Sequence, residues 1–383
     1  MGCYRMRPNE GNALWDARRD EYPASRRLVY LNHAAVAPLC RAAAEAMQGL
    51  AREVLEEGAR NFYRWLQTYE GLRVAAAAMI GANKREIAIV KNTSEGLATI
   101  ANGIDWKPGD RVVGFREEFP ANYFPWRHLE KRGVTVEWLS ASGPLEQIDE
   151  ACRGARLLAI SFVQYLSGYR ADLESIGEIC ARRGCLFVVD AIQGLGAFPV
   201  DVRKCRIDAL AADGHKWLTG PEGCGILYVR EGLQDQIEPT EIGWTNFASQ
   251  EYGNRDMTLR SDAARYECGT LNTIGCYGLK AAIEYLCSVG IERIGAEVQA
   301  LADRLAEGVH ARGWEILGTR TPANGAGIVS FRRADVDSRV VVRRLREASI
   351  EAAPRQGWVR ASPHFYVLPE EIDRTLEVLD CLD

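Results

Sequence analysis

A lysine stands where a run of apolar residues ends, in the segment DALAADGHKWLTGPEGCGILYV (residues 208–229). Residues 208–212 have the composition of a buried strand, and Asp213, His215 and Lys216 follow before a turn rich in glycine and proline. An amine at the edge of an apolar strand can have a lowered pKa and can form Schiff bases. A lysine whose stem merely covers apolar surface fits the same pattern, so Lys216 predicts chemistry only in combination with other residues.

Two further strand ends supply such partners. Asp190 closes the apolar run 186–190, where a carboxylate is costly unless an arginine or a protonated ring nitrogen compensates its charge. Thr93 and Ser94 follow the strand-like residues 86–90 and open a helix, whose N-terminus favours an anion but also suits an ordinary cap. A reactive lysine, a carboxylate for a ring nitrogen and a phosphate-binding helix terminus are the three contacts that pyridoxal phosphate requires.

These residues need a sheet that brings strand ends together. Runs with strand composition alternate with segments of helical periodicity, which predicts an α/β fold: a mostly parallel, seven-stranded sheet flanked by helices. The runs are residues 86–90, 111–115, 135–139, 157–163, 186–190, 208–212 and 225–229. In such a sheet a ligand binds beyond the carboxyl ends of the strands, which is where the residues above lie.

The length of 383 residues favours two domains. We expect an N-terminal arm over residues 1–29, a large cofactor-binding domain over 30–260, and a smaller C-terminal α/β domain over 261–383. The second domain is predicted because strand and helix patterns resume after a loosely patterned stretch of some forty residues, and its length is usual for a domain.

Composition excludes several classes of function. A net charge of -5 and dispersed arginines argue against a nucleic-acid partner. No apolar run reaches the roughly 20 residues that span a bilayer, so no membrane association is expected. The eleven cysteines show no CxxC pair and no Cys/His ligand spacing. They therefore predict reduced thiols in a cytoplasmic protein without a metal site.

Seven short segments between about residues 30 and 363 can be compared with a known family: YLNHAAVAPL, NTSEG, EEFPANYFPW, VVDAIQGLG, ADGHKWLTGPEGCGILYV, RYECGTLNT and VRASPHFY. In content and order they resemble the class V aminotransferases, which are pyridoxal-phosphate enzymes of fold type I. This family includes cysteine desulfurases, selenocysteine lyases, isopenicillin-N epimerase and kynureninase. The resemblance implies an enzyme that binds pyridoxal phosphate, acts on an amino acid and forms a homodimer with shared active sites.

The resemblance also implies roles for residues around the cofactor. Lys216 would form the Schiff base with the cofactor and move protons at the substrate Cα, and Asp190 would keep the pyridine nitrogen protonated. Gln193 would hydrogen-bond the ring 3-oxygen, and Phe119, or its neighbour Pro120, would contact the ring face. The residues expected to bind the phosphate are Thr93, Ser94 and His215.

Other matching positions concern the partner subunit and the substrate. Thr270, in RYECGTLNT, would reach the phosphate of the neighbouring subunit. Arg360, in VRASPHFY, would clamp the substrate α-carboxylate with its bidentate fork. Asn32, His33 and Arg355 are further candidates for substrate contacts, although a histidine in this place is also a common structural residue.

The chain departs from the desulfurases of this family at two places. Asp213 stands where they carry a phosphate-binding serine, so it must turn away from the phosphate or pair, for example with His215. The segment AAPRQGWVR (residues 352–360) lacks the cysteine that attacks the substrate sulfur, and Cys224 and Cys268 are interpreted as apolar filling.

The motifs leave the reaction open. An aminotransferase or C–S lyase-like activity is favoured, and an epimerase of the isopenicillin-N epimerase type is the nearest alternative. A non-enzymatic binding or assembly module is a third hypothesis. The joint retention of Lys216, Asp190 and Arg360 argues against this third hypothesis.

Overall fold

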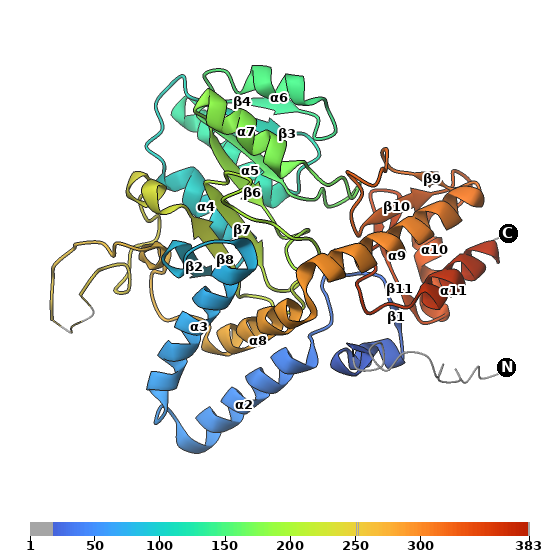
Figure 1. The fold of residues 1–383 in the computed structure, drawn as a ribbon, viewed down its shortest axis with the longest axis horizontal. Helices are drawn as coiled ribbons and strands as arrows, with labels where there is room; N and C mark the ends of the chain where they lie inside the picture. Colours follow the sequence, from blue (N-terminus) through green and yellow to red (C-terminus); the bar gives the residue numbers. More distant parts are fainter. Residues whose placement is uncertain (1–17, 250, 252, 382–383) are drawn as a thin grey trace.

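The structure is a computed structural model and describes residues 18–249, 251 and 253–381. Its largest element is a sheet made of β2 (Ile87–Val90), β3 (Arg111–Phe115), β4 (Thr135–Leu139), β5 (Leu157–Ser161), β6 (Leu186–Asp190), β7 (Ala209–Asp213) and β8 (Gly225–Val229). The strands lie in the order β2-β8-β7-β6-β5-β3-β4, and Figure 1 shows this sheet with its flanking helices. Only β8 among them runs against its neighbours. The predicted mostly parallel, seven-stranded α/β fold is confirmed.

Side chains of the central strands alternate between two apolar cores, which is why the strands read as continuous apolar runs. In β6, Phe187 and Val189 belong to one core and Val188 to the other. Helices α3 (Phe62–Ile80), α6 (Leu145–Ala151), α7 (Leu173–Arg183) and α8 (Thr273–Val289) contribute to the first core. Helices α4 (Thr93–Gly103) and α5 (Phe124–His128) contribute to the second. The sheet is thus buried on both faces, as its composition predicts.

Local sequence signals set the helix that faces the candidate site. Helix α4 begins after Asn92, whose side chain accepts a hydrogen bond of 2.9 Å from the backbone N–H of Glu95. Gly96 lets α4 approach β7 closely, because a Cβ there would lie 2.8 Å from the Cβ of Ala211. The N-terminus of α4 is therefore held beside the carboxyl end of β7.

A second unit lies at one end of the molecule (Figure 1). Its four-stranded antiparallel sheet contains β9 (Glu315–Ile316), β10 (Val329–Arg332), β12 (Ala353–Arg355) and β13 (Trp358–Ala361). Its helices are α9 (Ile291–Ala311), α10 (Ser338–Glu347) and α11 (Pro369–Asp380), and β1 (Val29–Tyr30) pairs with β11 (Ile350–Glu351).

Core packing divides the chain differently from the predicted boundaries. Helix α8, placed in the small domain by a boundary at residue 261, packs on α3 and on α2 (Arg41–Glu57) in the core of the large sheet. Conversely, Val29 and Leu31 belong to the apolar core of the second unit. Of the predicted arm, residues 1–17 lie outside the described part of the chain.

Within the described residues, no single helix has both the length and the apolar composition needed to cross a membrane. Helices α8 and α9 meet those criteria only as a pair, and the pair is bent by 81°.

Candidate active site

Lys216 lies just beyond the end of β7, and only 8% of its surface is exposed. Its Nζ is 5.5 Å from the centre of the Phe119 ring, which extends from the segment after β3. Burial lowers the pKa of Lys216 to about 8, and the charge of Arg360 acts in the same direction while Asp190 opposes it. A substantial neutral fraction near pH 8 is what a nucleophilic amine requires.

Asp190 ends β6 and is buried. Its Oδ1 accepts a hydrogen bond of 3.1 Å from the N–H of Ile192, and no lysine or arginine of the described chain forms a salt bridge with it. Burial raises the pKa of Asp190 to about 6, against the effects of that hydrogen bond and of the Lys216 charge. The arginine partner that could have explained this carboxylate is therefore not found among the described residues.

Thr93, at the start of α4, is buried, and its Oγ1 accepts a hydrogen bond of 3.0 Å from the N–H of Asp213. Ser94 is exposed beside it. Nδ1 of His215 lies 3.0 Å from Oδ2 of Asp213, although the angles do not make this contact a well-directed hydrogen bond. Oδ1 of Asp213 accepts a hydrogen bond of 2.7 Å from the N–H of Gly214. The Asp213 carboxylate thus contacts His215 and the backbone N–H of Gly214, one of the two arrangements expected from the sequence.

Gln193 is buried and held at both ends of its amide. Its Oε1 accepts a hydrogen bond of 3.0 Å from Nε1 of Trp217, and its Nε2 donates one of 3.0 Å to the carbonyl of Ala34. An amide nitrogen carries two hydrogens, so one donor remains for a ligand.

Arg360 reaches the same region from β13 in the second unit, and only 2% of it is exposed. Its Nη1 donates a hydrogen bond of 2.8 Å to the carbonyl of Tyr165, but its Nε and Nη2 are buried without a partner in the described chain. Burial lowers the pKa of Arg360 to about 10, and the nearby charge of Arg355 contributes. A buried cation with two unused donors is strained electrostatically and requires an anion.

His33 and Asn32 differ in whether they have hydrogen-bonding atoms available for a ligand. Nδ1 of His33 is 2.8 Å from the carbonyl of Ser362, Nε2 is 2.6 Å from the hydroxyl of Tyr366, and burial holds its pKa well below the usual range. His33 therefore acts as a neutral connector inside the fold, and we do not retain it as a substrate contact. Oδ1 of Asn32 is buried and without a partner among the described residues.

Thr270, expected to serve the neighbouring subunit, is exposed in the single chain. It lines a cavity of about 110 Å³ together with Lys91, Glu95 and Cys268. Its contact with a partner subunit stays a prediction.

Sequence reasoning missed Glu118, a buried carboxyl in the segment after β3. Its oxygens accept hydrogen bonds of 2.7 Å from the N–H of Ser161 and 2.9 Å from Nε2 of Gln164, and the Ser161 hydroxyl also donates to it. Burial raises its pKa to about 7, against these hydrogen bonds and with a smaller contribution from Asp190. The available signal was an acidic pair, Glu117 and Glu118, directly after a strand.

A cavity of about 650 Å³ opens between the two units next to this region. Its walls include Glu118, Gln164, Tyr165 and Gln356, but not Lys216 or Asp190. The cavity therefore lies beside the lysine and not over it.

The fold and this arrangement define the class of protein: a fold-type I enzyme that depends on pyridoxal phosphate. The family model of the class V aminotransferases matches residues 29–374, and the chain belongs to this family. A probable cysteine desulfurase of Pyrococcus abyssi (strain GE5 / Orsay) is 32% identical, with 95% of this chain and 96% of that protein covered.

Two solved structures are similar over nearly the whole chain. The apo structure of a cysteine desulfurase from Thermococcus onnurineus NA1 has a TM-score of 0.88 and 30% identity, covering 99% of this chain and 98% of the other. The complex of the cystine C–S lyase C-DES with its reaction product cysteine persulfide has a TM-score of 0.87 and 25% identity, covering 94% and 98%.

The residues of this chain fit the cofactor. Lys216 and Asp190 are buried and neither forms a salt bridge within the described chain, and Nε and Nη2 of Arg360 are buried without a partner there. Buried polar groups are normally satisfied, so these side chains fit a charged cofactor and its amino-acid substrate.

Proposed function

We propose that this enzyme is a C–S lyase that acts on a sulfur-containing amino acid by β-elimination. Bound pyridoxal phosphate supplies an electron sink for the negative charge that develops at the substrate Cα. The neutral amine of Lys216 takes the Cα proton, the Cβ–S bond breaks, and sulfur leaves with the bonding electron pair. The leaving sulfur takes up a proton, and water releases the amino group, so that the products are a 2-oxo acid, ammonia and sulfide from cysteine, or a thiol or persulfide from S-substituted cysteine or cystine.

The cofactor is held by residues from several strand ends in this proposal. Asp190 would keep the ring nitrogen protonated, the free amide hydrogen of Gln193 would donate to the ring 3-oxygen, and Phe119 would contact the ring. Thr93, Ser94 and His215 would bind the phosphate. The pairing of Asp213 with His215 supports this assignment, because it directs the carboxylate away from the phosphate.

Arg360 binds the substrate carboxylate and fixes which Cα bond faces Lys216. Its two unpaired donors provide the bidentate geometry for a carboxylate. Asn32, whose side-chain oxygen is buried without a described partner, would accept a hydrogen bond from the substrate amino group.

The turn between β12 and β13 is the observation that favours lyase chemistry over protein-persulfide chemistry. Gln356 and Gly357 join the two strands directly, both with positive φ (49° and 83°), as in a tight hairpin turn. Nε2 of Gln356 is further fixed by a hydrogen bond of 2.8 Å to the hydroxyl of Tyr165. The turn holds no cysteine and has no slack to carry one to the substrate sulfur.

Epimerisation is less well supported. It requires a second proton donor on the face opposite the lysine, and the residue assigned to a ring face is Phe119, which has no titratable group. The similarity to the cystine C–S lyase structure also favours elimination.

Product analysis tests the proposal. Holoenzyme is incubated with L-cysteine, L-cystine and L-alanine, and 2-oxo acid, ammonia, reduced sulfur and D-amino acid are measured. We expect 2-oxo acid and ammonia in equal amounts from the sulfur substrates, with no persulfide on the protein by mass spectrometry. Lys216→Ala should abolish turnover and the visible band of bound cofactor. Alanine as product, a 2-oxo acid formed only with an added amino acceptor, or D-amino acid would each overturn the C–S lyase assignment.

We also infer that the active form is a homodimer. Apolar side chains of α2 and α3 are exposed in the single chain, among them Leu55 (85%), Tyr63 (71%) and Phe62 (48%). Such a patch is typical of an interface. Analytical ultracentrifugation should give twice the mass of 42.5 kDa. The double substitution Leu55→Glu and Tyr63→Glu should shift the protein toward monomer. The same variant should retain the cofactor less well if Thr270 acts across the interface. A wild-type monomer would contradict the inference.

A further inference from the structure

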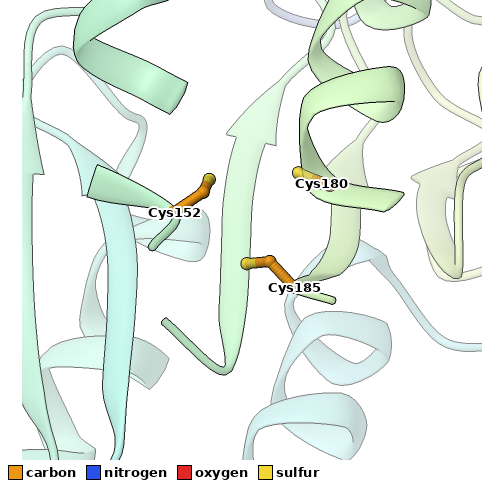
Figure 2. A group of neighbouring side chains, drawn as sticks. All are labelled: Cys152, Cys180 and Cys185. Atoms are coloured by element: carbon orange, nitrogen blue, oxygen red, sulfur yellow. The ribbon is translucent and has the colours of Figure 1, made fainter. Parts of the chain in front are cut away.

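Three cysteines meet near the amino ends of the strands of the large sheet, whereas Lys216 lies beyond the carboxyl ends. Cys152 caps the C-terminus of α6, Cys180 lies near the end of α7, and Cys185 directly precedes β6. Their Sγ atoms all lie within 4.8 Å of one another, and Figure 2 shows the three side chains directed toward a common space. Since Asp190 ends the same strand, the cluster is about 16 Å from the cofactor region at roughly 3.3 Å per residue.

The spacing of the sulfur atoms suits a shared metal ion. Thiolates bound tetrahedrally to Zn²⁺ at about 2.3 Å are separated from each other by about 3.8 Å. All three cysteines are at most 4% exposed, so their sulfurs cannot turn to solvent. Small adjustments of χ1 would bring three sulfurs already within 4.8 Å to this separation.

A guanidinium, itself paired at 2.9 Å with Glu137, reaches the end of the helix that Cys152 caps. Arg111 lies beside the cluster because its Nη2 donates a hydrogen bond of 3.2 Å to the carbonyl of Ala151.

A fourth protein ligand is not offered by the described residues, because no histidine or carboxylate joins the group. The nearby Asp149 is occupied by Arg182, at 2.7 Å, and by Arg183. Cys180 and Cys185 also line a cavity of about 490 Å³, which has room for a water molecule. Three protein ligands with one position open to water is a known zinc arrangement.

We propose that Cys152, Cys180 and Cys185 bind one Zn²⁺ as three thiolates, with water from the adjoining cavity as the fourth ligand. Three thiolates and Zn²⁺ carry a net charge of −1, which the neighbouring arginines balance. The ion would link α6 and α7 to the amino end of β6 and so stabilise their packing. It would take no part in the reaction at the carboxyl ends of the strands. Binding releases the thiol protons to solvent, so affinity rises with pH.

Metal titration of the reduced, metal-free holoenzyme tests this site. We expect one equivalent of Zn²⁺ by elemental analysis, and one equivalent of Co²⁺ giving a thiolate charge-transfer band that Zn²⁺ abolishes. Cys152→Ala, Cys180→Ala and Cys185→Ala should each weaken binding at least about 100-fold, since even residues outside the ligand set affect affinity 10- to 100-fold. Cys287→Ala, at an exposed cysteine of α8, is the matched control and should bind like wild type.

X-ray absorption on the wild-type zinc form needs no variant to fold and should show three sulfur neighbours at about 2.3 Å. The visible cofactor band should be the same with and without zinc, because the two sites are far apart. Failure of the wild type to bind Zn²⁺, retention of zinc in the three cluster variants, or binding of Cu⁺ without Zn²⁺ would overturn the assignment.

Discussion

Two buried arginines in this molecule have opposite surroundings. Arg73 on α3 forms a bidentate pair with the buried Glu267, with Nη2 at 2.5 Å from Oε2 and Nε at 3.3 Å from Oε1. The attraction of Glu267 outweighs the burial of Arg73, and the pKa of Arg73 is raised. Arg360 is buried to a similar degree but contacts only a carbonyl, and its pKa is lowered to about 10.

The buried carboxylates differ in the same way. Glu267 accepts hydrogen bonds from Arg73 and, at 2.9 Å, from the N–H of Ile89. Asp190 accepts one from Ile192 and lacks a cationic partner in salt-bridge contact within the described chain. Arg73 and Glu267 are paired inside the fold, whereas Arg360 and Asp190, for which we propose ligand-binding roles, have no charged partner in salt-bridge contact within the described chain. This contrast supports the proposed site without reference to motifs.

Loss of the paired arginine should have the largest effect on stability. Arg73→Gln leaves Glu267 buried without its cation, which typically costs about 3–5 kcal/mol of unfolding free energy. Urea unfolding followed by circular dichroism measures the change. Glu70→Gln is the control, because Glu70 is a half-exposed partner of Arg73 and its removal should cost less than about 1 kcal/mol. An equal loss of unfolding free energy in the two variants would show that the buried Arg73–Glu267 pair stabilises the fold no more than the exposed Arg73–Glu70 pair.

Loss of the unpaired arginine should instead affect the reaction. Arg360→Gln removes the carboxylate clamp, and we expect kcat/KM to fall about 10²- to 10³-fold, largely through KM, since charged hydrogen bonds of this kind are worth several kcal/mol. Stability should be unchanged or higher, because an uncompensated buried charge is removed. Arg355→Gln, at an exposed neighbour, should change kcat/KM only a few-fold. A loss of stability in Arg360→Gln without a change in KM would contradict the comparison.

The unpaired residues of this contrast, but not the paired ones, could be predicted from the sequence. Strand composition pointed to Asp190 and Lys216, because each follows an apolar run at or just beyond a strand end. Arg360 lies inside β13, and only the order of the family's motifs pointed to it. Whether a charge has a partner was not predictable, since Arg73 and Glu267 are 194 residues apart.

Other features depend on contacts between distant parts of the chain, which the sequence does not show. The cysteine cluster joins Cys152 to residues about thirty positions later, a spacing that resembles no short metal motif. The apolar face of α8 fits either core by composition, and packing places it in the core of the large sheet. Both nitrogens of His33 lie within hydrogen-bond distance of the segment after β13.

Glu118 extends the comparison to pH. Its pKa rises from 4.5 to about 7 on folding, so between these values the folded state holds a proton that the unfolded state releases. Stability therefore falls as pH rises from 4.5 through 7, by about 3 kcal/mol for 2.5 pH units. Glu118→Gln should lack this part of the pH dependence in urea unfolding between pH 5 and 8. Glu117→Gln, at an exposed neighbour, should follow wild type, and identical curves for wild type and Glu118→Gln would refute the raised pKa.

The smallest expected effect concerns the titration of Lys216. In cofactor-free protein only the neutral amine reacts with pyridoxal phosphate, so the rate at which the visible band forms should fall about tenfold per pH unit below pH 8. The charge of Arg360 lowers the pKa of Lys216, so Arg360→Gln should move the midpoint of this profile upward, by less than about one pH unit. Arg73→Gln should leave the midpoint unchanged, because the Arg73 charge is neutralised by Glu267. Equal shifts of the midpoint in the two variants would mean that pairing with Glu267 does not neutralise the effect of the Arg73 charge on Lys216.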